Sequence, residues 1–197
     1  MNNNKNKPRS FIASLIALIA VAACSATQPM VSERLDDKTA VTITNARTPL
    51  IMSLDRYFSD ANAREYVQIG AIEINRMGAR EHFLWLGIWD IDHLESEAAK
   101  PRGYDTIHLI ADGQTIPLDV HGWTHDSIGA SSSSYKKIFA EVIDAYYKIS
   151  LEQLEAFKSA VVVKLQTTSA TPKEFIYWYN QERASADLAE FYRVVSQ

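Results

Sequence analysis

Three side chains in one predicted hairpin have the types and spacing that acid–base chemistry or metal binding would need. Asp112-Gly113 is a strong signal for a two-residue hairpin loop within Tyr104–His121. In the register that this loop imposes, His108, Asp119 and His121 share one face of the hairpin. Diagonal neighbours on one face lie about 7–8 Å apart, so both histidines could approach the carboxylate. These residues are therefore candidates for a metal site or a His–Asp acid–base pair.

The same residues also fit a polar, solvent-facing side of a hairpin, and that alternative stays open. The opposite face of the hairpin is apolar, as a core face would be; it holds Ile107, Leu109, Ile116, Leu118 and Val120. His121 and His125 are four residues apart, but Gly122 lies between them and no helix is expected there. Their spacing therefore does not place them on one helical face.

A second group of acidic residues follows a tryptophan-rich segment. Asp90 and Asp92 would share one face at the end of a strand expected over Glu81–Ile91, with His93 next to them. A cation site is conceivable there, because carboxylate oxygens are the ligands that Ca²⁺ prefers. The spacing does not match an EF-hand loop, and a polar strand end would show the same residues.

Aromatic residues offer a third kind of site. Trp85 and Trp89 are four residues apart on the expected strand and so share a face, about 13 Å apart. Together with Trp123 and Trp178 they could form an aromatic platform for a glycan or a protein partner. Packing in the hydrophobic core is the alternative for the same residues.

The elements that must position these residues are mostly short strands. Strands are expected over 39–45, 66–76, 81–91, 104–111, 114–121, 138–147 and 161–166. A capping box, Ser150 to Gln153, predicts a short helix to about Ala160, and an amphipathic helix is expected over Ala186–Val195. Thr171-Pro172-Lys173-Glu174 also matches a capping box, although the FIYWYN after it could equally be extended. The serine-rich stretch 126–134 is expected to be a flexible loop.

These elements predict a mostly β fold with terminal helices, in the α+β class. The expected architecture is an antiparallel β-sandwich or a curved sheet with one or two C-terminal helices packed on it. The segment Tyr66–Arg76 carries Val67, Ile69 and Ala71 on one face, with Ile72 and Ile74 on the other. Strands that are apolar on both faces are either covered twice or face a partner.

The start of the chain has the pattern of a targeting signal. Basic residues at 5, 7 and 9 precede the apolar run Phe11–Ala23, which is too short to span a bilayer. The run ends in Val21-Ala22-Ala23-Cys24, which resembles the lipobox of bacterial lipoproteins. This resemblance implies cleavage before Cys24, acylation of Cys24 and stable anchoring in a membrane. The non-acidic Ser25 resembles an outer-membrane retention signal.

The expected organisation is a lipoprotein signal peptide over 1–23, a lipidated cysteine and flexible tether over 24–38, and one globular β-rich domain over 39–197. Removing the first 23 residues removes three of the 20 Lys and Arg and none of the 24 Asp and Glu, so the net charge becomes −7. An acidic chain is a poor candidate for nucleic-acid binding. With Cys24 acylated, no thiol remains for a disulfide, a metal cluster or a nucleophile.

The sequence therefore predicts a lipid-anchored protein of the bacterial cell envelope, placed in the outer membrane and facing the periplasm. Its expected partners are the membrane, through the anchor, and an envelope protein or glycan. Phosphate-binding loops and the common hydrolase motifs do not occur, so the balance is against an enzyme, and no cofactor is expected. The favoured function is a non-enzymatic binding or accessory module. The alternative is a metal-binding protein or hydrolase that uses the His/Asp residues of the hairpin.

Overall fold

The chain folds into a closed antiparallel β-barrel of eight strands, with two further strands attached to it. A computed structural model describes residues 28–54, 65–94 and 100–197. The strands are β1 (Val31–Asp36), β2 (Val41–Ala46), β3 (Leu50–Leu54), β4 (Tyr66–Arg76), β5 (Ala79–Trp89), β6 (Thr106–Ala111), β7 (Gln114–Gly122), β8 (Ile143–Lys148), β9 (Val163–Thr167) and β10 (Glu174–Tyr179). The helices are α2 (Ile91–Leu94), α3 (Leu151–Ser159) and α4 (Gln181–Val195), with a 3-10 helix over His125–Ile128.

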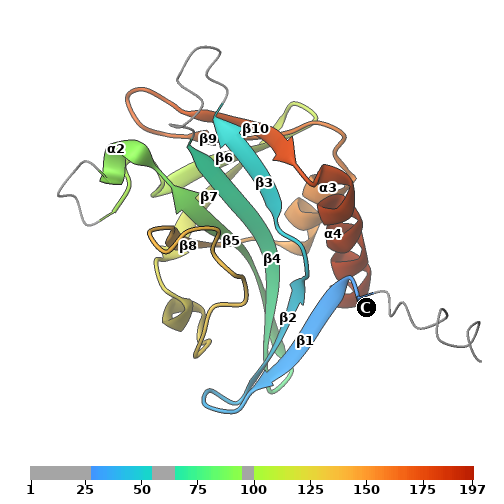
Figure 1. The fold of residues 1–197 in the computed structure, drawn as a ribbon. Helices are drawn as coiled ribbons and strands as arrows, with labels where there is room; N and C mark the ends of the chain where they lie inside the picture. Colours follow the sequence, from blue (N-terminus) through green and yellow to red (C-terminus); the bar gives the residue numbers. More distant parts are fainter. Residues whose placement is uncertain (1–27, 55–64, 95–99) are drawn as a thin grey trace, which may run out of the picture.

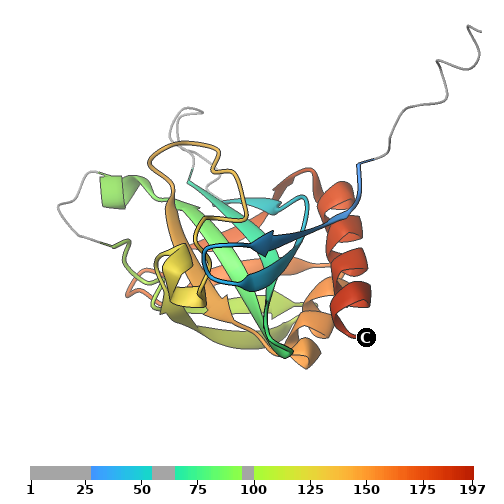
Figure 2. The same cartoon turned by 90° about the horizontal axis from the view of Figure 1, so that it is seen from below.

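The sheet closes into a barrel, and this closure corrects the predicted architecture. Around the barrel the strands follow the order β4, β3, β10, β9, β6, β7, β8 and β5, and β5 pairs with β4 to close the ring (Figures 1 and 2). The prediction of a β-sandwich or curved sheet is therefore wrong, although the β-rich class is right. The joins between β3 and β10 and between β6 and β9 link distant parts of the chain. Hairpin signals carry no information about such pairs.

Strand β4 is the central element, because it has different partners along its two halves. Its first half pairs with β3, and its second half pairs with β2. The other edge of β4 pairs with β5 along the whole strand, from Tyr66 opposite Trp89 to Arg76 opposite Ala79. β1 and β2 therefore form a two-stranded ribbon that is paired to the second half of β4 and lies outside the ring of eight strands (Figure 1).

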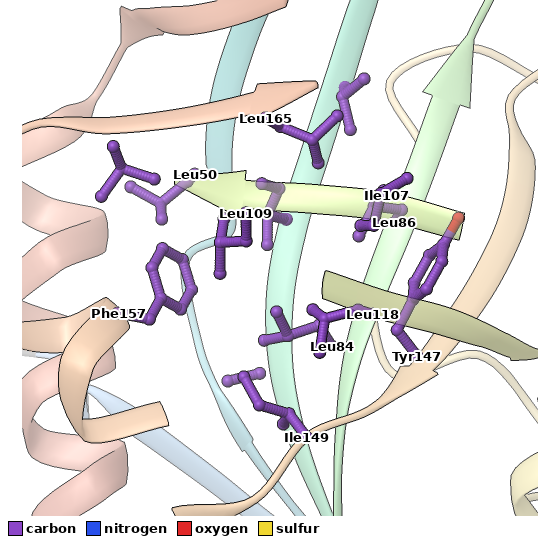
Figure 3. Close-up of a cluster of buried hydrophobic side chains, with 14 of the residues drawn as sticks. Leu50, Leu84, Leu86, Ile107, Leu109, Leu118, Tyr147, Ile149, Phe157 and Leu165 are labelled. Carbon is purple, nitrogen blue, oxygen red and sulfur yellow. The ribbon is translucent and has the colours of Figure 1, made fainter. Parts of the chain in front are cut away.

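The inner faces of the strands supply the main hydrophobic core. Figure 3 shows buried side chains from several strands meeting inside the barrel, among them Leu50, Leu84, Leu86, Ile107, Leu109, Leu118, Tyr147 and Leu165. Phe157 of α3 joins the same cluster. The hydroxyl of Tyr147 donates a hydrogen bond of 2.6 Å to the carbonyl oxygen of Tyr104. An eight-stranded barrel is just wide enough for side chains to fill, and here the interior serves as the core.

A second core covers the outside of β4, β5 and β8. Its buried side chains include Ile72 and Phe83 of the barrel wall, with Ile128 and Tyr135 from the connection between β7 and β8. The stretch 126–134, expected to be a flexible loop, is therefore packed against the barrel. The strand expected over 138–147 begins only at Ile143, because the residues before it belong to this covering connection. Two cores explain why β4 and β5 are apolar on both faces.

Gly70 makes room for that covering segment. A Cβ atom at Gly70 would overlap the ring of Tyr135. The Tyr135 hydroxyl donates a hydrogen bond of 2.8 Å to the carbonyl oxygen of Ala71, and burial raises the pKa of this hydroxyl well above its usual value. Close packing of an aromatic ring on the barrel wall therefore requires glycine at position 70.

Gly70→Ala is expected to lower the free energy of unfolding by about 1–3 kcal/mol, because the added methyl group displaces the Tyr135 ring. Urea unfolding measures this change. In a Tyr135→Ala background the same substitution should cost much less, since the ring is gone. Equal costs in both backgrounds would show that Tyr135 does not occupy this position.

One of the two predicted capping boxes starts a helix and the other does not. The Ser150 hydroxyl accepts from the Gln153 amide and the Gln153 side chain accepts from the Ser150 amide, which confirms the predicted capping box of α3. The second capping-box match starts no helix, because Glu174–Tyr179 forms β10 between β3 and β9. The final helix, α4, begins five residues earlier than the expected Ala186.

Among the described residues no helix is long and apolar enough to cross a membrane.

Residues 31–36, expected to belong to a flexible tether over 24–38, form strand β1 instead, and Cys24 lies outside the described residues. Asp36 at the end of β1 is buried and accepts two hydrogen bonds from Ser131, at 2.6 Å from the backbone amide and 2.7 Å from the hydroxyl. These bonds lower the pKa of Asp36 from 3.8 to about 2. The carboxylate thus fastens the β1–β2 ribbon to the connection between β7 and β8.

Asp36→Asn is expected to destabilise the fold at pH 7. A depressed pKa contributes stability that is present above the ordinary value, near pH 4, and is lost as the pH falls towards 2. The difference in urea midpoint between wild type and variant should therefore shrink between pH 4 and pH 2. Asp37→Asn, at the exposed neighbouring position, is the control and should follow the wild type. A constant difference across this pH range would contradict the assignment.

Candidate functional site

The predicted hairpin forms with the expected register, yet two of its three candidate residues, Asp119 and His121, have separate local partners. Thr106 lies opposite Asp119 and donates a hydrogen bond of 2.7 Å to its carboxylate. Nε2 of His121 lies 3.1 Å from the carbonyl oxygen of Ser127. Its ring packs at 5.3 Å from the ring of Phe83.

The third residue, His108, lies opposite Pro117 on β7 and opposite Gln166 on β9. In the part of the chain that the structure describes, no group of three His, Cys, Asp or Glu residues is arranged to hold a metal ion. His108, Asp119 and His121 are therefore not brought together into such a group.

Asp90, the first of the acidic residues after β5, stabilises the fold at the barrel rim, and the side chain of Asp92 lies outside the described part of the structure. The strand ends at Trp89, and the Asp90 carboxylate accepts a hydrogen bond of 3.1 Å from the His93 amide at the start of α2. The other carboxylate oxygen of Asp90 lies 2.9 Å from Nζ of Lys173. The same Nζ lies 2.9 Å from the Glu65 carboxylate.

Glu65, Asp90 and Lys173 form what we call the rim ion cluster. Both carboxylate side chains are 3% exposed and the lysine side chain is 13% exposed. Glu65 precedes β4, Asp90 follows β5 and Lys173 precedes β10, so the cluster ties three strand ends together. Asp90 was predicted as a site residue but its two partners were not, because Glu65 and Lys173 are distant from it in sequence and no local pattern links them to it.

A second ionic group, centred on the buried Glu73, lies near the β4–β5 hairpin. Glu73 accepts from Nε of Arg80 at 2.7 Å and lies 3.1 Å from Nε2 of His82. Burial lowers the pKa of His82 below its usual value, although the Glu73 carboxylate opposes that shift. Arg80 also donates to the carbonyl oxygen of Gln197, so this group holds the C-terminus against the barrel.

The tryptophans divide between the core and the surface. Trp85 is fully buried, its ring stacks on Tyr135 at 4.9 Å between centroids, and its Nε1 donates to Asp144 at 2.8 Å. Trp85 therefore cannot bind a partner in this fold. Trp89 is partly exposed and packs on Phe139 at 4.7 Å. The two tryptophans do not form one platform.

Exposed aromatic side chains do gather around Trp89. Tyr66 lies opposite Trp89 on the neighbouring strand, and its ring is 5.1 Å from that of Trp178, which in turn is 6.1 Å from that of Tyr179. Phe139, Trp178 and Tyr179 are 43%, 50% and 62% exposed. We call the set Tyr66, Trp89, Phe139, Trp178 and Tyr179 the aromatic surface.

The fold explains why this surface exists. The β10 strand pairs with β3 with a shift in register between Tyr177 and Tyr179, so two consecutive aromatic residues, Trp178 and Tyr179, are exposed. Phe139 comes from the connection that covers the outer core. The rim ion cluster lies directly beneath, since Glu65 and Asp90 are the chain neighbours of Tyr66 and Trp89. Strands, connection and ion cluster together hold the rings in place.

Known proteins do not identify this chain. Comparisons with protein-family models, with curated proteins and with solved structures find no match. Exposed, contiguous aromatic side chains are typical of binding surfaces. Of the sequence candidates Trp89 and Trp178 lie on this surface, whereas Tyr66, Phe139 and Tyr179 were missed.

Proposed function

We propose that this protein is a lipid-anchored component of the bacterial cell envelope and that its barrel is a non-enzymatic binding module. The aromatic surface carries this proposal. Burying an aromatic side chain removes 150–250 Å² from water, so five neighbouring rings supply a large driving force for contact. A barrel interior filled by core side chains leaves the outside of the barrel as the place for a partner.

The anchor rests on the resemblance of Val21-Ala22-Ala23-Cys24 to a lipobox. Acylation of Cys24 would hold the barrel at the membrane, and the outer membrane facing the periplasm is the proposed location because Ser25 is not acidic. The partner would then be a component of the same envelope. An envelope protein, a glycan and the lipid itself are the classes that the test must separate.

Oxidative footprinting tests both halves of this proposal in one experiment. Cells producing the full chain and the purified protein in detergent are exposed to hydroxyl radicals, and peptides are measured by mass spectrometry. Trp178 and Tyr179 should be protected in cells relative to the purified protein. Met77, which is 99% exposed on the β4–β5 turn, is the control and should be oxidised equally in both samples.

The same spectra test the anchor, since the N-terminal peptide should begin at an acylated Cys24. Equal oxidation of Trp178 and Tyr179 in both samples would contradict binding at the aromatic surface. An N-terminal peptide that begins elsewhere, or an unmodified Cys24, would contradict the anchor.

A further inference from the structure

The tether between the proposed anchor and the barrel is very short. Because β1 begins at Val31, six residues separate it from Cys24. Fully extended, six residues span at most about 20 Å. The barrel is therefore held within about one small-domain diameter of the bilayer surface, and one side of it must face that surface.

The start of β1 lies near the Tyr179 end of the aromatic surface. Met30, the residue before β1, accepts a hydrogen bond of 2.9 Å from the Arg47 amide. Four residues further along, Ile51 of β3 lies opposite Tyr179. In Figures 1 and 2 β1 starts beside α4, and through β2 it is joined to the half of β4 that is farther from Tyr66. A tether that starts at Met30 thus brings the Tyr179 end of the aromatic surface towards the membrane.

We propose that the aromatic surface is seated on the bilayer that holds the Cys24 anchor, at the boundary between headgroups and acyl chains. This inference rests on the proposed function and names the partner as lipid. Tyrosine and tryptophan favour this boundary because each has an apolar ring and a polar group that stays hydrated. Anchor and rings together would fix the orientation of the barrel on the membrane.

The net negative charge of the chain distinguishes contact through aromatic rings from electrostatic binding to anionic lipid. Without its first 23 residues the chain has 17 Lys and Arg against 24 Asp and Glu. Attraction to anionic headgroups needs clusters of basic residues, so an acidic protein should depend on its rings. Contact with phosphatidylcholine, which has no net charge, is therefore sufficient, and raising the salt concentration should not release it.

Quenching of tryptophan fluorescence by brominated lipid tests whether the aromatic surface contacts the bilayer. The mature acylated protein, which begins at Cys24, is reconstituted into phosphatidylcholine vesicles with or without bromine on the acyl chains. Bromine should quench roughly a quarter to a half of the fluorescence, because two of the four tryptophans lie on the aromatic surface. Trp178→Phe should remove much of this quenching while keeping an aromatic ring. Trp123 is partly buried against the main core and lies outside the aromatic surface. Trp123→Phe is therefore the matched control and should keep the quenching.

The possible outcomes distinguish membrane contact by the aromatic surface from anchoring through Cys24. Vesicle-bound protein with no bromine quenching, or with quenching that Trp178→Phe leaves unchanged, would overturn the membrane seat and leave the anchor standing. Protein that does not bind the vesicles at all would overturn the anchor and the seat together. Quenching that disappears at high salt while the protein stays bound would overturn the aromatic mode of contact.

Discussion

Trp85→Ala is expected to lower the free energy of unfolding by about 3–5 kcal/mol, the usual cost of removing a large buried aromatic side chain. The indole is fully buried, stacks on Tyr135 and donates a hydrogen bond of 2.8 Å to Asp144. Its loss would open a cavity in the outer core and loosen the connection between β7 and β8. Urea unfolding followed by circular dichroism measures the change.

Trp178→Ala is the matched control, since it removes the same side chain from the exposed aromatic surface. Surface substitutions usually change stability by no more than about 0.5 kcal/mol, so this variant should unfold close to the wild type. Similar losses at Trp85 and Trp178 would show that the division between core and surface tryptophans is wrong.

Lys173→Met is expected to cost about 3–5 kcal/mol, because it leaves the Glu65 and Asp90 carboxylates buried without their lysine. Both carboxylates lie 2.9 Å from Nζ and are 3% exposed. Thermal unfolding at pH 7 measures the change.

A surface ion pair with similar geometry provides the comparison. Nζ of Lys164 lies 2.8 Å from the Glu174 carboxylate, but both side chains are 39% exposed. Lys164→Met should therefore cost less than about 1 kcal/mol. A loss at position 173 as small as this would show that the rim ion cluster does not hold the strand ends together.

Local signals predicted much of the secondary structure. The Asp112-Gly113 loop, with positive φ at both residues, fixed the pairing of β6 with β7 as expected. The strand expected over Tyr66–Arg76 matches β4, and its two apolar faces belong to different cores. These features depend on neighbours in sequence, which a single chain displays.

Closure of the barrel could not be predicted in this way. It depends on β3, which sequence analysis missed because Leu50–Leu54 is short and follows a proline. It also depends on the extended conformation of β10, where a capping-box pattern competed with strand pairing. Tertiary pairing of β10 with both β3 and β9 outweighs the local helix signal.

The candidate site was predicted only in part for a related reason. Alternation along a strand says which residues share a face, but it does not say whether that face is covered. Trp85 and Trp89 share a face of β5, yet the connection between β7 and β8 buries the first and leaves part of the second exposed. Only the packed structure separates a core residue from a surface residue here.

The central claim is that the aromatic surface is where the anchored barrel contacts the envelope, and cross-linking from that surface tests it most directly. Tyr179 is replaced by p-benzoylphenylalanine in cells, and the adduct on the peptide that contains position 179 is weighed after irradiation. The same replacement at Val161, which is 78% exposed and outside the surface, is the control. We predict a phospholipid adduct at position 179 and none at position 161. Absence of any adduct at position 179, or equal yields at both positions, would contradict the account.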